Sequence, residues 1–122
     1  MIKFITELAL KADTNGYNRI VNNEFIVEVG GEVFVMPIGF RTNLANTPKW
    51  IHWLLPPDDP HYIRAAIVHD FLYGRATVSR KQADTIFRKL AIHDGTSTGV
   101  AYLMYICLRL FGSSHYNPKR FK

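Results

Sequence analysis

The hydrophobic pattern of this chain changes its period near residue 46, and that change limits the folds open to it. Before this point β-branched and aromatic residues gather in short runs, whereas after it the apolar residues recur at helical spacing. A length of 122 residues suits one domain. We therefore expect a single α+β domain over residues 1–122, mostly β over 1–45, helical over 46–112, and ending in a basic tail over 113–122.

The β region contains a strong hairpin signal. Phe25–Val29 and Glu32–Met36 are rich in β-formers, and the Gly30-Gly31 pair between them tolerates the positive φ of a two-residue turn. The pattern predicts that the two runs pair antiparallel in a small sheet. Ile2–Lys11 is ambiguous, because its β-branched start favours a strand while its second half could be helical.

About four packed helices are expected to follow this sheet. A short one over Lys49–Leu55 follows an Asn-Thr-Pro start, and a second spans about His61–Tyr73 and stops at Gly74. The third begins after Ser79, whose Ser-x-x-Gln pattern has the form of a capping box, and it closes at Gly95.

The fourth expected helix, Thr98–Phe111, is apolar nearly all round. Such a helix is usually central in a core. We therefore expect four of its side chains to be mostly buried, either in the core or against another copy of the chain: Leu103, Ile106, Cys107 and Leu110.

A polar cluster interrupts the apolar helix expected over residues 61–73. His69 and Tyr73 are four residues apart and therefore share a face, whereas Asp70 projects about 100° away from His69. If the next helix packs antiparallel, Asp84 comes level with His69, because the two residues are nearly equidistant from the turn between the helices. At the spacing of about 8–10 Å between packed helices, an Asp84–His69 hydrogen bond can form and fix the imidazole tautomer.

Two interpretations of this cluster stay open. In the first, His69, Asp84 and Tyr73 are catalytic residues, with His69 as the general base. In the second, the same side chains, together with Asp70 and Arg80, form a buried network that sets the helix register. Its simplest version is an Arg80–Asp84 ion pair one turn apart.

Three blocks in order resemble a family of small phage and prophage proteins of unknown function. The family pattern is Gly-Phe-x-Thr-Asp-x-Ala-Ser-x-Pro, then Ala-x-x-x-His-Asp-x-x-Tyr, then Arg-x-x-Ala-Asp. The matching stretches are Gly39–Pro48, Ala65–Tyr73 and Arg80–Asp84. The resemblance implies a phage or prophage origin and gives no established activity. Asn43 stands where the family has an acid, and Asn46 where it has serine, which weakens any metal site that the acid would supply.

A second, local resemblance is to the phospholipase A2 active site, which pairs a His-Asp-x-x-Tyr helix with an aspartate on an antiparallel helix. It implies that His69 is the general base, that Asp70 binds calcium, that Asp84 orients the histidine and that Tyr73 supports it. The glycine-rich calcium loop and the disulfides of that family are missing, since Cys107 is the only cysteine.

The other sequence features are weaker indications of function than this cluster. His93-Asp94 precedes Gly95 at an expected helix end, where a capping role is favoured. The net charge of +5 favours anionic partners, and Lys119, Arg120 and Lys122 in the tail could contact an anionic surface. No apolar run is long enough to span a membrane.

These observations predict a phage-type accessory protein. We expect it to be virion-associated, in the tail or a related assembly, to act by protein–protein binding, and to reside in the host cytoplasm or the virion. The alternative is a phospholipase A2-like or other small hydrolase that uses His69 as general base.

Overall fold

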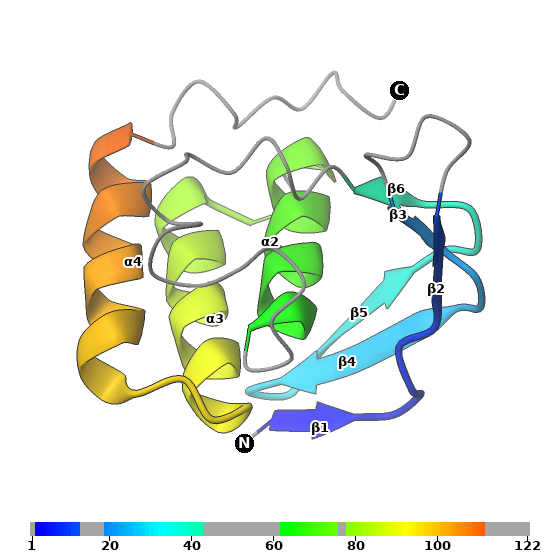
Figure 1. Cartoon of the computed structure of the whole chain (residues 1–122), viewed down its shortest axis with the longest axis horizontal. Coiled ribbons are helices and arrows are strands. Elements are labelled where there is room, and N and C mark those ends of the chain that lie inside the picture. Colours follow the sequence, from blue (N-terminus) through cyan, green and yellow to red (C-terminus); the bar gives the residue numbers. More distant parts are fainter. Residues whose placement is uncertain (1, 13–18, 43–61, 76–77, 112–122) are drawn as a thin grey trace. The chain divides into compact units, whose positions relative to one another are not determined.

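A computed structural model describes residues 2–12, 19–42, 62–75 and 78–111 of the chain (Figure 1). The chain divides into two compact units, residues 1–58 and 59–122. The described strands lie in the first unit and the described helices in the second, which confirms the α+β class. A single domain over the whole chain stays a prediction.

Two small antiparallel sheets make up the described part of the first unit. The first sheet has the order β1-β4-β5, and the second has the order β2-β3-β6. The second half of Ile2–Lys11 is therefore not helical, because it leads into a strand. The strands are β1 (Ile2–Phe4), β2 (Leu10–Ala12), β3 (Arg19–Val21), β4 (Phe25–Val29), β5 (Glu32–Met36) and β6 (Arg41–Thr42).

The predicted hairpin is confirmed as the β4–β5 pair. Phe25 lies opposite Met36, and Val27 lies opposite Phe34, in an antiparallel register. All four side chains are buried, because the period of two along each strand places them on the same face. The turn between the strands holds two glycines at φ of 58° and 88°, a conformation that other residues rarely adopt.

Three helices form the described part of the second unit: α2 (Ile63–Arg75), α3 (Arg80–His93) and α4 (Thr98–Phe111). The described residues thus contain three helices where about four were expected along the whole chain, and the expected helix over Lys49–Leu55 lies outside the described residues. Helix α2 continues through Gly74 instead of stopping there. The Ser79 N-cap is confirmed, since its hydroxyl accepts a hydrogen bond from the Gln82 amide at 3.1 Å.

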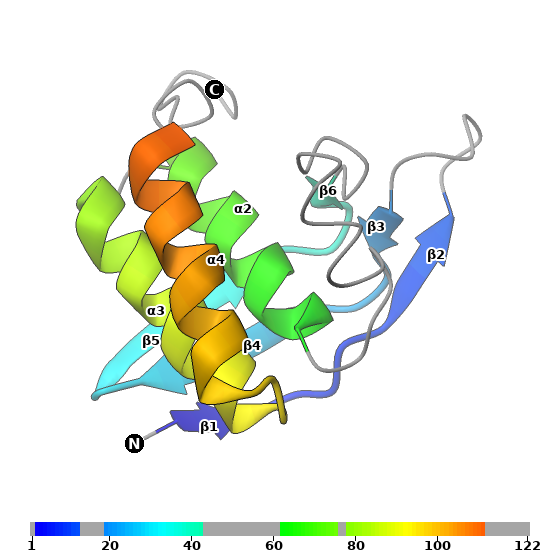
Figure 2. The ribbon, with the colours of Figure 1, turned by 60° about the vertical axis from the view of Figure 1, so that its left-hand side comes forward.

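Helix α3 lies between α2 and α4 in the view of Figure 1 and packs against both, and in Figure 2 α4 lies in front of α3. Short connections make neighbouring helices antiparallel. Gly95, at a φ of 105°, lets the chain reverse between α3 and α4, which confirms the predicted end of α3. The buried side chains of α3 repeat at helical spacing: Ala83, Asp84, Ile86, Phe87, Leu90 and Ala91.

Helix α4 does not occupy the central position that its apolar sequence predicts. Leu103, Ile106 and Leu110 are 44%, 50% and 66% exposed in the single chain, and Cys107 is half-buried. The prediction that they lie in the core is therefore wrong. The reason is that the central place in the layer belongs to α3, so α4 buries the face with Ala101 and Met104 and leaves the other open. Burial against another copy stays a prediction.

None of the helices in the described ranges combines the length and apolar character that crossing a membrane requires.

Candidate functional site

The side chains of His69, Tyr73 and Asp84 come together between α2 and α3. The Nε2 atom of His69 lies 2.7 Å from Oδ1 of Asp84. The Tyr73 hydroxyl donates a hydrogen bond to the same oxygen. This confirms the predicted proximity of Asp84 to His69. The juxtaposition follows from the antiparallel helices, because the Ser79 cap starts α3 at the register that brings Asp84 level with His69.

Aromatic rings hold the imidazole of His69 on two sides. The Tyr73 ring, one helical turn later, lies with its centroid 4.0 Å from that of His69. The Phe87 ring on α3 approaches edge-on at 5.5 Å. A ring packed in this way has few rotamers open to it, so the hydrogen bond to Asp84 is made at a small entropic cost.

A fourth residue, Arg109 on α4, completes the cluster. Its Nη1 atom donates to Oδ2 of Asp84 at 3.0 Å. Arg109 was not predicted from the sequence, although one signal pointed to it: Arg109 is the only charged side chain in the apolar stretch of α4. A lone charge in such a helix needs a partner when it is partly buried.

Arg80 does not form the ion pair with Asp84 that the spacing of one turn suggested. It reaches α4 instead, where its two terminal nitrogens donate to the backbone oxygens of Leu108 and Arg109 at 2.9 and 3.1 Å. Arg80 therefore satisfies carbonyl groups in the last turn of α4, where the helix dipole favours a cation.

The electrostatics of the cluster favour an ionised Asp84. Burial by itself would raise the pKa of this carboxyl, but the hydrogen bonds from His69, Tyr73 and Arg109 and the attraction of His69 outweigh it, so the pKa lies below its ordinary value. Tyr73 shifts the other way. Burial, and then its bond to the Asp84 carboxylate, raise the pKa of the Tyr73 hydroxyl well above its usual value, so it stays a donor.

The imidazole of His69 has one nitrogen occupied and one open. Asp84 is a carboxylate and accepts, so Nε2 of His69 carries the proton, and Nδ1 of the neutral ring is an acceptor. Among the described residues, Nδ1 has no hydrogen-bond partner. The His69 side chain is 12% exposed, whereas Asp84 is fully buried. The imidazole is therefore the partly exposed member of the pair, while the carboxylate is shielded from water.

Asp70, the candidate calcium ligand, follows His69 on α2 and is half-buried. In the parts of the chain that the structure describes, no three His, Cys, Asp or Glu side chains are grouped closely enough to hold a metal ion. Asn43 and the basic residues Lys119, Arg120 and Lys122 lie outside those parts.

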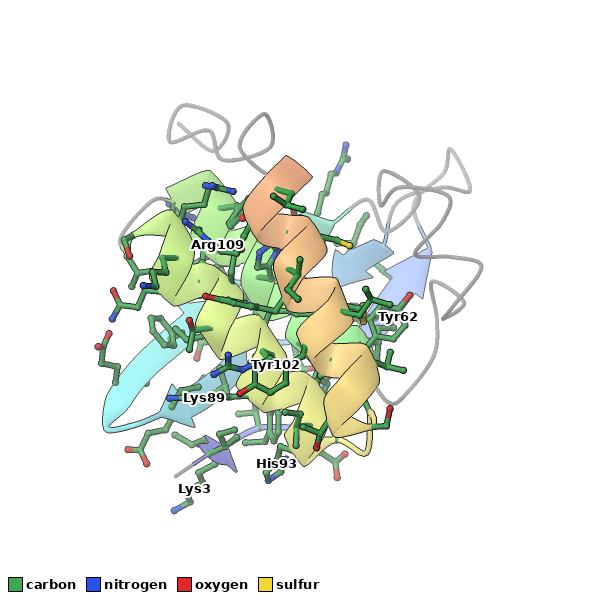
Figure 3. All side chains as sticks on the ribbon, turned by 90° about the vertical axis from the view of Figure 1, so that its left-hand side faces the viewer. Lys3, Tyr62, Lys89, His93, Tyr102 and Arg109 are labelled. Carbon is green, nitrogen blue, oxygen red and sulfur yellow. The ribbon has the colours of Figure 1, made fainter. Side chains whose placement is uncertain are left out.

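The second His-Asp pair, His93-Asp94, has the capping geometry that its position at a helix end favours. Asp94 is the C-cap of α3, and its carboxylate is held by Arg64 of α2 through both oxygens. His93 is 45% exposed, and its Nδ1 lies 3.3 Å from Asp94. Figure 3 shows His93 toward the other end of the helices from Arg109.

Comparison with known proteins places the chain in one family. Residues 20–108 match the family described as a protein of unknown function (DUF1353), and because this match spans most of the chain, the protein belongs to that family. The match covers His69, Tyr73 and Asp84 and ends one residue before Arg109. No curated protein and no solved structure shows a significant match.

Proposed function

We propose that this protein is a small hydrolase in which His69 is the general base, acting on an ester in the manner of a phospholipase A2. The observation that carries the proposal is the hydrogen bond of 2.7 Å between His69 Nε2 and the buried Asp84 carboxylate. It leaves Nδ1 as a proton acceptor on a side chain that is still partly exposed. A carboxylate that fixes the tautomer of a histidine is a recurring arrangement for general bases.

The chemistry follows from the two nitrogens of one ring. Nδ1 of His69 takes a proton from water as the water oxygen attacks the ester carbonyl, which forms a tetrahedral intermediate. The Asp84 carboxylate stabilises the imidazolium formed in this step. As the ester C–O bond breaks, the imidazolium returns the proton to the departing alkoxide. The products are a carboxylic acid and an alcohol, and the base is regenerated.

Tyr73 supports this role by position. Its hydroxyl shares the oxygen of Asp84 that His69 uses, and its ring packs on the imidazole. The resemblance to phospholipase A2 implies that Asp70 binds calcium. Among the described residues, Asp70 belongs to no group of three His, Cys, Asp or Glu side chains that could hold a metal ion.

The test is hydrolysis of short-chain phospholipids and simple esters, with and without calcium. We expect the wild type to turn over at least one of these, and His69→Ala to lower kcat/KM by a factor of about 10²–10⁴, the usual contribution of a general base. His93→Ala is the matched control, because it removes a histidine beside an aspartate at the exposed end of α3. Thermal melts establish that both variants are folded. A folded His69→Ala variant with unchanged activity would contradict the proposal.

A second candidate is the phage-type accessory protein, virion-associated and acting by protein–protein binding in the host cytoplasm or the virion. One observation favours it: four large apolar side chains are exposed along α4, namely Tyr102, Leu103, Ile106 and Leu110. Grouped apolar side chains on a surface are typical of interaction sites. Sedimentation of the wild type and of Leu110→Lys tests whether this face mediates self-association; identical monomers in both would count against that form of the candidate.

A further inference from the structure

Three cations form a basic stripe along the outer side of α3: Lys81, Arg88 and Lys89. Arg88 and Lys89 follow Lys81 after about two helical turns, so all three lie on the same side of the helix. Lys81 and Lys89 are exposed, and Arg88 is half-buried. The stripe extends over about 10–12 Å of the helix axis, which is long enough to contact more than one phosphate of an extended polyanion.

No exposed acid balances this basic stripe on α3 or α4. Asp84 and Asp94, the acids within α3 and at its C-cap, are 0% and 2% exposed, and each already binds an arginine. Helix α4, which packs against α3, contains no acidic residue. Among the described residues, the three cations of the stripe form no ion pair. This side of the two helices therefore carries a positive charge that attracts anionic partners.

The stripe's arginine is held in place by two aromatic rings of α4. The guanidinium carbon of Arg88 lies 4.5 Å from the ring centroid of Tyr102 and 5.0 Å from that of Tyr105. A guanidinium that rests on the face of a ring keeps most of its N–H groups for an acceptor. Among the described residues, these N–H groups have no acceptor. Arg88 is therefore positioned in advance for a phosphate, which accepts two such bonds in parallel.

Tyr102 adds a stacking surface beside this guanidinium. Its side chain is 45% exposed, although Arg88 lies over the ring. In Figure 3, which looks onto α4, Lys89 and Tyr102 project from neighbouring helices. Cations combined with exposed aromatic rings are typical of surfaces that bind single-stranded nucleic acid, because each base can stack on a ring. The bases of a duplex are already stacked on one another, so only a single strand can use the ring of Tyr102.

We propose that the basic stripe and Tyr102 form a binding site for single-stranded nucleic acid, in which the three cations contact phosphates and Tyr102 stacks on a base. The site goes beyond the hydrolase function and does not depend on it, because it uses none of the side chains that bind Asp84. A lipid headgroup supplies the same phosphate but no base for the ring, so the experiment separates these two sources.

The experiment measures fluorescence anisotropy of a labelled oligothymidylate of about 20 nucleotides, which is longer than common single-strand site sizes, and of a duplex of the same length. The variants are Arg88→Gln, Tyr102→Ala and Tyr102→Phe. Arg75→Gln is the matched control, because Arg75 is an exposed arginine on α2 that also lies over a ring, that of the buried Phe71. Co-sedimentation with vesicles of phosphatidylglycerol and phosphatidylcholine tests a lipid surface, and thermal melts establish that every variant is folded.

We expect the wild type to bind the single strand more tightly than the duplex, with an affinity that falls as the salt concentration rises. Arg88→Gln should weaken binding of the single strand about fivefold or more. Tyr102→Ala should weaken it about tenfold, as for the loss of one stacked base. Tyr102→Phe keeps the ring and should retain most of the affinity, and Arg75→Gln should have a smaller effect than Arg88→Gln.

Equal losses in Arg88→Gln and Arg75→Gln would overturn the site, because only the overall charge would then matter. Equal affinity for the strand and the duplex, or full affinity in Tyr102→Ala, would overturn the stacking role and the assignment to a single strand. Binding to the vesicles without binding to either oligonucleotide would assign the basic stripe to a lipid surface and overturn the proposal. Absence of binding to every probe would also overturn it.

Discussion

Two aspartates, Asp84 within α3 and Asp94 at its C-cap, are each approached by an arginine and a histidine, yet the two clusters differ in how the carboxylate is shared. At Asp94, Arg64 bonds both oxygens, and His93 stands at 3.3 Å. At Asp84, Arg109 takes one oxygen, and His69 and Tyr73 share the other. The first arrangement clamps the end of a helix. The second holds an imidazole by one nitrogen and leaves the other for chemistry.

The comparison also shows which sequence pattern matters. His-Asp neighbours occur at both sites, at residues 69–70 and 93–94. The general-base geometry comes from His69 and Asp84, which are fifteen residues apart, and not from either adjacent pair. A dipeptide motif therefore says little until the packing of the helices is known.

The largest difference between the two clusters should appear when each carboxylate is removed. Asp84→Ala strands a buried hydroxyl, an imidazole and a guanidinium, so we expect the free energy of unfolding to fall by about 3–5 kcal/mol. Asp94→Ala leaves Arg64, which is 33% exposed and can be hydrated, so its cost should be about 1 kcal/mol. Denaturant unfolding of both variants measures the two losses in free energy. Equal losses would contradict the proposed difference between the two clusters.

The Asp84 cluster depends on α4, whereas the residues that hold Asp94 come from α2 and α3. Met104 is 2% exposed on the inner face of α4, and its neighbour Leu103 is 44% exposed. We expect Met104→Ala to cost about 2–5 kcal/mol, as for other buried large-to-small changes, and Leu103→Ala to cost less than about 1 kcal/mol. The two variants should be compared in a monomer. If Leu103→Ala lowers the free energy of unfolding as much as Met104→Ala does, the outer face of α4 is covered, which would contradict the account.

Replacing Tyr73 should have a smaller effect on stability, and this effect should depend on pH. Its hydroxyl donates to a carboxylate, so Tyr73→Phe should cost about 1.5–3 kcal/mol at neutral pH. Because burial and Asp84 raise the pKa of Tyr73 in the folded state, this contribution is complete below the ordinary value of 10.0 and is lost as the pH rises above it. The gap between wild type and Tyr73→Phe should therefore narrow above pH 10.0 in chemical denaturation. Tyr102→Phe, at an exposed position, is the control and should show no gap.

The smallest of these expected effects is the loss of stability at acid pH. The folded-state pKa of Asp84 lies below the ordinary value of 3.8, so the carboxylate contributes stability above that value and loses it as the pH falls toward its own lower pKa. The wild type should be more stable than Asp84→Asn near neutrality, and the gap should close below pH 3.8. A gap that is independent of pH would mean that the ionised form of Asp84 is not preferred.

Much of the layout follows from local patterns in the sequence. The Gly30-Gly31 hairpin, the Ser79 cap and the Gly95 stop are each set by backbone chemistry at one or two residues, so they could be predicted. Asp84 could be placed near His69 because a short turn between two helices sets their register. Neither argument needs long-range information.

The features that could not be predicted depend on which helix lies at the centre of the helical unit. The apolar sequence of α4 suggested a central helix, but packing placed α3 there, and no local pattern records that choice. Arg109 was missed for the same reason, since its link to Asp84 requires α4 to lie on α3 in a particular register. Its isolation in an apolar helix was the signal available.

The most direct test of the central claim is the tautomer of His69, read by long-range ¹⁵N–¹H correlation NMR of the imidazole near neutral pH. Asp84 as acceptor requires the proton on Nε2 and a bare Nδ1. We therefore predict the Nε2–H tautomer in the wild type, with a loss of that fixed preference in Asp84→Asn, while the exposed His93 gives the same spectrum in both. A proton on Nδ1 of His69 in the wild type, or a spectrum of His69 unchanged by Asp84→Asn, would contradict the role of Asp84 and leave His69 without the open acceptor that a general base needs.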